Sequence, residues 1–124
     1  MLAVAGCAIT LNTFADTRVD EVFTCKVKEG KEIKDVRKAN AEWVKHMNSA
    51  VKVGTIASAT VTPVVGEGGG SFFFVDTYPS LEAWATADNY QNSEAGQAAM
   101  KSISDALDAV SDCTSNRLYR FNPD

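Results

Sequence analysis

The sequence predicts an α+β fold in which a four-stranded antiparallel sheet carries helices on one face. The first observation is the order of elements after residue 15, which reads strand, helix, strand, strand, helix, strand. Right-handed crossovers place such strands in the spatial order 4-1-3-2. The second observation is a cysteine near each end of this set. In the predicted order the first and last strands are neighbours. The 124 residues suit one domain.

The first strand and the first helix follow from their residue patterns. Residues 18–27 alternate as a strand does, with apolar side chains on one face and Glu21 as the exception. A turn at 28–31 leads into a helix over about 32–50. Its inner stripe recurs at spacings of three and four, which is typical of an amphipathic helix. The stripe consists of Ile33, Val36, Asn40, Trp43, Met47 and Ala50.

Two further strands form a hairpin. Residues 54–65 are rich in Thr, Val, Ile and Ala, and Pro63 near their end predicts an edge position or a bulge. The glycine-rich loop 66–70 does not open a helix and lacks a following Gly-Lys-Ser/Thr, which argues against a phosphate-binding loop. Residues 71–77 form the third strand. Its consecutive Phe72, Phe73, Phe74 and Val75 make both of its faces apolar.

The remaining elements are a two-part helical region and a last strand. Pro79 and Ser80 favour a helix start, with the helix running to about Tyr90. Ser93 is the candidate cap of a second helix. The last strand covers about 115–121. The second helix buries a stripe of Gly96, Ala99, Met100, Ile103, Leu107 and Val110.

Composition and motifs exclude several classes of function. The net charge of −4, without a Lys/Arg stripe, argues against a nucleic-acid site. His46 is the only histidine of the sequence, which excludes Cys/His zinc clusters of standard spacing. The sequence contains no nucleophile elbow, HExxH or EF-hand spacing. We therefore expect no metal, no cofactor, no nucleic acid and no membrane span.

The first fifteen residues are uncharged and resemble the hydrophobic part and cleavage site of a secretory signal peptide. They are too short to span a bilayer. The interpretation divides the chain into a truncated signal peptide (1–15) and a single domain (16–124), exported to the periplasm or secreted. Two alternatives stay open: a buried first strand, and lipidation at Cys7 within a lipobox-like Val4–Cys7.

The cysteines support export. Removal of residues 1–15 leaves an even pair, Cys25 and Cys113. In the expected topology the start of the last strand lies beside the end of the first, so the two residues come close. An oxidising compartment would join them in a disulfide. The alternative is two separate buried thiols.

The helices are expected to cover one sheet face only, so the apolar third strand needs a second cover. The simplest cover is the same face of a second subunit, which predicts a two-fold homodimer.

A resemblance covers residues 19–121. The segments VFTCKVKEGKEIKDVRKANAEWV, SFFFVDTYPSLEAWA and DCTSNRLYRF resemble the dimeric α+β barrel superfamily, whose subunits are ferredoxin-like. That superfamily includes antibiotic-biosynthesis-type monooxygenases, muconolactone isomerases, haem-handling enzymes and NIPSNAP-like proteins. The chain is closest to uncharacterised exported bacterial members. The resemblance implies the fold, the dimer and a pocket between the sheet and the first helix or inside the barrel.

Three candidate ligand-binding residues lie on the first helix. Asn40 is an amide on an apolar stripe, which indicates either a group presented to a ligand or an amide satisfied by its neighbours. Trp43, on the same stripe, is a core residue or a pocket wall. His46 lies on the flank of the stripe and can titrate near neutral pH, although a surface histidine fits as well.

Three more candidates follow the third strand. Asp76 and Tyr78 end that strand, where site residues often lie, although Asp before a turn and Pro is also common turn chemistry. Trp84 follows on the next helix, as a pocket residue or as packing over the sheet edge.

These residues support three functional hypotheses. The first is an exported accessory protein that binds a small hydrophobic molecule. The alternative is a cofactor-independent monooxygenase or isomerase of the barrel superfamily, acting on a small aromatic or hydrophobic substrate near Asn40, Trp43 and His46. The third is haem binding with His46 as the axial ligand.

Overall fold

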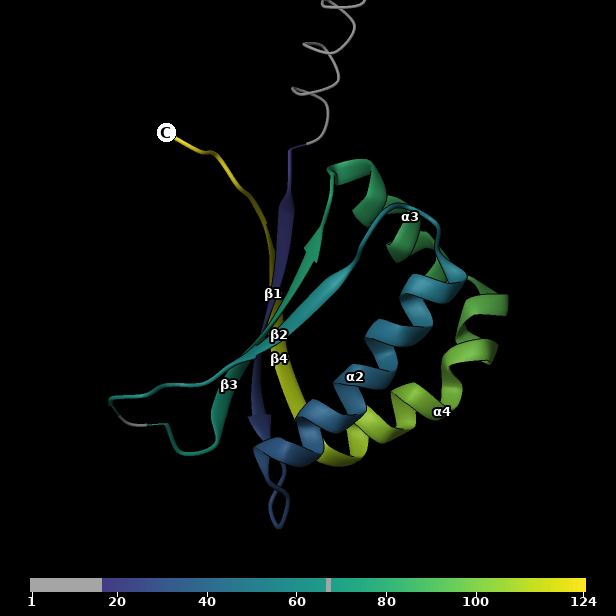
Figure 1. The fold of residues 1–124 in the computed structure, drawn as a ribbon. Coiled ribbons are helices and arrows are strands. Elements are labelled where there is room, and N and C mark those ends of the chain that lie inside the picture. Colours follow the sequence, from purple (N-terminus) through teal and green to yellow (C-terminus); the bar gives the residue numbers. More distant parts are fainter. Residues whose placement is uncertain (1–16, 67) are drawn as a thin grey trace, which may run out of the picture.

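The computed structural model describes residues 17–66 and 68–124, so the predicted signal peptide lies outside the described residues. The expected order of elements is confirmed, and α2, α3 and α4 all cover the same face of the sheet (Figure 1). Among the described residues no helix is long and apolar enough to cross a membrane. The elements are β1 (Val19–Val27), α2 (Ile33–Ala50), β2 (Ala57–Val61), β3 (Ser71–Tyr78), α3 (Leu81–Asn92), α4 (Glu94–Val110) and β4 (Ser111–Arg120).

The sheet has the strand order β2-β3-β1-β4 with every neighbouring pair antiparallel, which confirms the predicted topology. The two central strands, β1 and β3, pair along almost their whole length, from Val19 opposite Tyr78 to Lys26 opposite Ser71. Their inner faces therefore carry the residues on which the helices pack.

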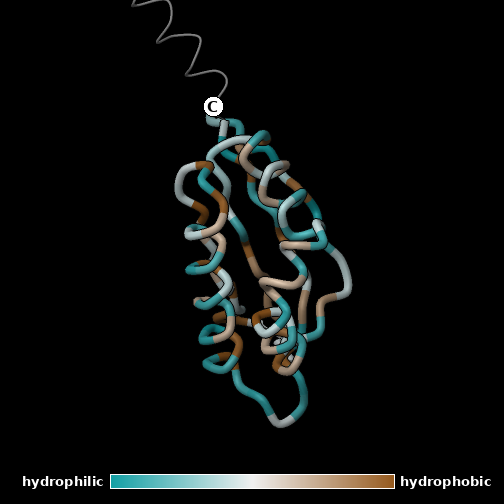
Figure 2. Tube along the Cα trace, turned by 90° about the vertical axis from the view of Figure 1, so that its right-hand side faces the viewer, coloured by the Kyte–Doolittle hydropathy of each residue, from teal (hydrophilic) through white to brown (hydrophobic). Residues whose placement is uncertain are grey.

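The helices begin where the sequence predicts. Ser80 Oγ accepts a hydrogen bond from the Ala83 backbone N–H at 3.1 Å, and Ser93 Oγ accepts one from Gly96 at 3.0 Å. Figure 2 looks onto the helical layer, where hydrophilic and hydrophobic segments alternate along each helix. Alternation of this kind is expected of helices that bury one stripe against a sheet.

Strand β2 is shorter than expected, covering Ala57–Val61 rather than 54–65. The physical reason lies at Ile56, whose side chain is buried in the core. Its backbone N–H donates to Asn48 Oδ1 at 2.9 Å, and its carbonyl accepts from Asn48 Nδ2 at 2.7 Å. The backbone of Ile56 is thus held by helix α2, and the chain joins the sheet one residue later. The edge position predicted from Pro63 is confirmed, although Pro63 itself follows the strand.

Strand β4 begins earlier than expected, at Ser111 instead of about residue 115. Helix α4 runs directly into it, and pairing with β1 starts already at Val27 opposite Ser111. The register shifts between Thr24 and Cys25. Cys113 consequently lies inside the strand, where the sequence placed it just ahead.

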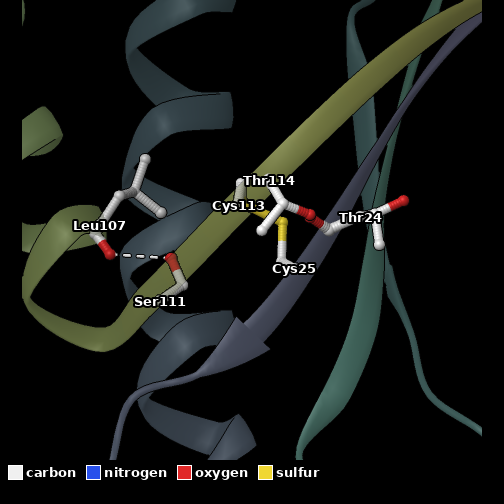
Figure 3. Close-up of a disulfide and its surroundings, with 6 residues drawn as sticks. All are labelled: Thr24, Cys25, Leu107, Ser111, Cys113 and Thr114. Atoms are coloured by element: carbon white, nitrogen blue, oxygen red, sulfur yellow. Dashed lines mark hydrogen bonds between the residues drawn. A yellow bond between two sulfur atoms is a disulfide. The ribbon is translucent and has the colours of Figure 1, made fainter.

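A disulfide joins Cys25 to Cys113, as the sequence predicts. The two residues are direct partners on β1 and β4, with their Cα atoms 4.0 Å apart. Figure 3 shows the bond crossing between the two strands beside the end of α4, where Ser111 Oγ donates to the Leu107 carbonyl. The bond fastens the edge strand β4 to the centre of the sheet.

The sheet face away from the helices stays open. Its apolar side chains come from all four strands, and Phe73 on the inner strand β3 is 45% exposed. In each strand these residues alternate with those that face the helices. The members of this outer apolar face are Val22, Val61, Phe73, Val75 and Tyr119.

The disulfide makes a stability prediction. The double substitution Cys25→Ala/Cys113→Ala removes a bond between residues 88 positions apart, and a closed loop of that length is worth roughly 3–5 kcal/mol in the chain-entropy model. We expect urea unfolding to show a loss of this order. Reducing agent should lower the stability of the wild type and leave the double variant unchanged. Equal unfolding curves for oxidised and reduced wild type would contradict the prediction.

Candidate functional site

A polar layer crosses the core between two apolar clusters. One cluster surrounds Met47 and Tyr78, and the other surrounds Cys25 and Phe72. Between them lie three buried polar side chains from three elements: Glu21 of β1, Asn40 of α2 and Asp76 of β3. Because burial of polar groups is costly, their arrangement needs a compensating hydrogen-bond network.

A cavity of about 280 Å³ lies at this layer, between the sheet and the helices. This volume is close to the lower end of the range typical of small-molecule pockets, roughly 300–1,000 Å³. The aromatic rings of Phe23, Trp43, Phe74 and Tyr78 form much of its wall. The other lining residues are Glu21, Asn40, Asp76, Gln91, Leu107, Asp108, Ser111 and Cys113.

Asp76 is the most unusual group in the cavity wall. Its side chain is 6% exposed, and its Oδ1 accepts a hydrogen bond from Ser58 Oγ at 2.5 Å. Ser58 in turn accepts from Asn40 Nδ2 at 2.9 Å. Asn40 therefore orients the Ser58 hydroxyl toward the carboxyl group. The second oxygen, Asp76 Oδ2, has no hydrogen-bond partner among the described residues.

Burial raises the pKa of Asp76 to about 7, and the neighbouring Glu21 adds to this rise, while the Ser58 hydrogen bond opposes it. Glu21 stands directly opposite Asp76 on β1. Both oxygens of Glu21 are bonded: Trp84 Nε1 donates to Oε1 at 3.0 Å and Asn116 Nδ2 donates to Oε2 at 2.6 Å. Both oxygens of Glu21 thus accept hydrogen bonds, whereas Asp76 has a pKa near neutral pH.

Tyr78 lies at the end of β3 and is 1% exposed. Burial is the main cause that raises the pKa of its hydroxyl, and the carboxyl groups of Asp76, Glu21 and Asp88 raise it further. The hydroxyl is therefore neutral at physiological pH. No described residue forms a hydrogen bond with it, so it is a second polar group that the cavity leaves free.

The indole of Trp43 is fixed in the cavity wall. Its Nε1 donates to Gln91 Oε1 at 3.0 Å, a contact between α2 and α3. This bond holds the indole in place, and Trp43 both lines the cavity and packs in the core.

The structure brings Asn40, Trp43, Asp76 and Tyr78 together around this cavity. The other two candidates lie outside its wall. Trp84 contacts the cavity wall through Glu21, because its Nε1–H donates a hydrogen bond to Glu21 Oε1. His46 Nε2 lies 2.8 Å from the Tyr90 hydroxyl, and the two rings stack with their centroids 6.0 Å apart.

Sequence reasoning missed Glu21, Ser58 and Gln91. Glu21 left a signal, because it is the one charged residue on the apolar face of the first strand. Ser58 and Gln91 left none, since a polar residue on an edge strand or at a helix end is ordinary.

A second hollow, a groove of about 580 Å³, lies between α2 and the edge strand β2. Asn40 lines both hollows, and Arg37 gives the groove a cationic group that the cavity lacks. A pocket between the sheet and the first helix was predicted, and the structure has one on each side of Asn40. The groove is also lined by Ile33, Ala41, Val44, Ser58, Ala59, Thr60 and Thr62.

Within residues 17–66 and 68–124, no group of three or more His, Cys, Asp or Glu side chains is arranged to hold a metal ion.

No protein-family model and no curated protein matches this sequence. Solved structures do match the fold. The structure of SnoaB, a cofactor-independent oxygenase from Streptomyces nogalater, superposes with a TM-score of 0.58 at 11% identity and covers 87% of this chain and 96% of its own. A candidate antibiotic biosynthesis monooxygenase from Caulobacter crescentus gives a TM-score of 0.54 at 12% identity, covering 93% and 97%.

A third structure, a dimeric protein of unknown function and ferredoxin-like fold from Bacteroides fragilis, has a TM-score of 0.50 at 13% identity and covers 84% of this chain and 96% of its own. Together these likenesses establish the ferredoxin-like fold that the sequence resemblance implies. Identities this low show the fold alone, because this fold hosts many chemistries.

The raised pKa of Asp76 makes a prediction about stability. In the unfolded chain this carboxyl has its ordinary pKa near 4, whereas in the folded protein the pKa is about 7. Between these values the folded state holds a proton that the unfolded state does not, so stability falls as pH rises through this window and is level above it. The substitution Asp76→Asn removes this dependence.

We therefore expect the free energy of unfolding of Asp76→Asn, relative to that of the wild type, to rise by roughly 2–4 kcal/mol between pH 4 and pH 8. Urea unfolding at several pH values measures this difference. Asp105→Asn, which alters an exposed carboxyl on α4, is the control and should follow the wild type. A constant difference between Asp76→Asn and the wild type at all pH values would show that Asp76 titrates normally.

Proposed function

We propose that this protein binds a small apolar or aromatic compound in the cavity beneath α2 and α3. The proposal rests on one observation: the aromatic-walled cavity is also lined by Asp76 and Tyr78, whose Oδ2 and hydroxyl form no hydrogen bond with a described residue. Among the described residues no fully buried side-chain nitrogen or oxygen lacks a partner, so these two atoms are open to the cavity, where a ligand can pair with them.

A second candidate function is proton-transfer catalysis, as in an isomerase or a cofactor-independent oxygenase. Asp76 favours it, since a carboxyl with a pKa of about 7 suits a general base at neutral pH. In an isomerase the carboxylate takes a proton from one carbon of the substrate and returns it to another. The fold similarity to SnoaB is compatible with this candidate. Exchange of the α-hydrogens of small aromatic ketones with D₂O tests it, and exchange that Asp76→Asn leaves unchanged would exclude Asp76 as the base.

The assembly we propose is a homodimer formed through the outer apolar face. That face exposes a contiguous set of apolar side chains, which on a soluble domain marks an interaction surface. The Bacteroides fragilis protein of the same fold is dimeric. A two-fold axis would bring the Phe73 side chains of both copies into one interface.

We also propose that the protein is exported. The Cys25–Cys113 bond supports this, since disulfides persist mainly in oxidising compartments. Sequencing the N-terminus of material secreted by a bacterial host tests both this proposal and the predicted cleavage after residue 15. Retention of the whole chain in the cytoplasm with reduced thiols would contradict it.

Binding in the cavity makes a prediction that needs no knowledge of the natural ligand. Titration with small neutral aromatic compounds such as benzyl alcohol should shift the NMR signals of the Trp43 indole and the Gln91 amide saturably. Asp108→Trp, which places a ring at the cavity rim, should weaken binding roughly tenfold or more. Asp105→Trp on the same helix is the matched control, since it lies outside the cavity wall. Equal loss in both variants, or no saturable shift at all, would contradict binding at this place.

The proposed dimer makes a separate prediction. Phe73→Glu places a charge on the outer apolar face, and light scattering after size exclusion should report half the mass of the wild type, because burying an unpaired charge opposes association. Ser102→Glu, on the exposed side of α4, should stay dimeric. A monomeric wild type would contradict the proposed interface.

A further inference from the structure

The cavity has a one-sided charge distribution. Three of its lining residues carry carboxyl groups, Glu21, Asp76 and Asp108, and its wall includes no Lys, Arg or His. Arg37 lies on the other side of Asn40, in the groove between α2 and β2. A ligand anion would therefore meet only like charge in the cavity, and electrostatic repulsion in a partly buried place is strong.

Ionised Asp76 offers the cavity an acceptor oxygen, and the Tyr78 hydroxyl offers both a donor and an acceptor. Both oxygens of Glu21 are occupied by Trp84 and Asn116. Asp76 has one oxygen held by Ser58 and one without a partner among the described residues, although the side chain is 6% exposed. A ligand that satisfies Asp76 Oδ2 must bring a donor, and an ionised donor gives the stronger bond.

The aromatic wall favours the same kind of group. Trp43, Phe74 and Tyr78 line the cavity together with Asp76. The face of an aromatic ring attracts a cation within about 6 Å of its centroid. The acceptor oxygen of ionised Asp76, the surrounding carboxyl groups and three aromatic rings therefore lie around the same cavity.

We propose that the cavity is selective for small primary amines with an aromatic or aliphatic body, with the ammonium group donating to Asp76 Oδ2 and the body packing between the aromatic rings. This inference rests on the proposed binding function and narrows its ligand class. The neutral Tyr78 hydroxyl supplies a further acceptor for the same ammonium group, which has three N–H donors.

Binding of an amine is coupled to the proton of Asp76. The titratable groups that share the cavity wall with this carboxyl are Glu21 on β1, Tyr78 on β3 and Asp108 on α4, and none of them is cationic. Lys28 Nζ donates to the Asp108 backbone carbonyl and pairs with Asp112, outside the cavity wall. An ammonium group would be the first positive charge beside Asp76 and would favour its ionised form. Near pH 7, where the free protein holds this proton about half the time, binding must release it.

The test compares three probes of similar shape: benzylamine, benzyl alcohol and benzoate, titrated calorimetrically into the full protein at pH 6 and pH 8. Benzylamine stays protonated across this range. We expect it to bind at pH 8 about tenfold more tightly than benzyl alcohol. We expect its affinity to fall about tenfold at pH 6, where Asp76 is mostly protonated. At pH 7 the heat should vary with the ionisation enthalpy of the buffer, since a proton is released.

Asp76→Asn provides the matched variant. The amide keeps an acceptor for Ser58 and turns a donor toward the cavity, so the preference for benzylamine and its pH dependence should both disappear. NMR spectra of the variant check that it is folded. The pH dependence of benzylamine binding to the wild type tests the same inference without the variant.

The outcomes separate this inference from the binding function. Equal affinity for benzylamine and benzyl alcohol, or tighter binding of benzoate, would overturn the amine selectivity and leave the proposed binding intact. An affinity for benzylamine that does not change between pH 6 and pH 8 would remove Asp76 as its partner. No binding of any of the three probes would count against the binding function itself.

Discussion

Two acidic side chains face each other inside this protein, and much of the surrounding structure serves to accommodate them. Glu21 and Asp76 are direct cross-strand partners on the two central strands. Like charges placed opposite each other destabilise a sheet, and burial adds a desolvation cost. The structure accommodates the two carboxyl groups in different ways. Glu21 receives donors from α3 and β4, whereas Asp76 receives one donor and has its pKa raised to about 7.

The donors that hold this pair also tie the fold together. Trp84 connects α3 to β1 through Glu21, Asn116 connects β4 to β1, and the Asn40–Ser58–Asp76 chain connects α2, β2 and β3. Networks of this kind are stabilising when every member is satisfied and costly when one is left open. Among the described residues no fully buried side-chain nitrogen or oxygen of this network lacks a partner, and the cost that remains at Asp76 is the desolvation that raises its pKa.

The disulfide and the open apolar face lie on opposite sides of the sheet. The Cys25–Cys113 bond fixes β4 to β1 on the same inner face as Glu21, and Cys113 itself lines the cavity. The opposite face of the sheet offers apolar side chains that a second subunit can cover. One sheet thus separates a surface suited to assembly from a cavity suited to a ligand, with alternation of side chains along each strand assigning residues to one or the other.

The sequence by itself determined the order of elements, the neighbourhood of the first and last strands, the serine caps at Ser80 and Ser93, and the closeness of Cys25 and Cys113, while their disulfide was one of two alternatives until the structure showed it. Each depends on local patterns or on a topology with few alternatives. Asn40 was visible as an anomaly for the same reason, because an amide interrupts an apolar helical stripe. Asp76 and Tyr78 were visible as polar residues that end a strand.

Only the tertiary structure decided what these residues contact. The donors to Glu21 lie 63 and 95 residues away in the chain, and the Ser58 that holds Asp76 lies 18 away. It also placed His46 against Tyr90 and outside the cavity wall, and it delayed the start of β2 to Ala57 because Asn48 holds the backbone of Ile56. Hydrogen-bond partners and burial arise where distant segments meet, and local patterns carry no information about which particular side chains will meet there.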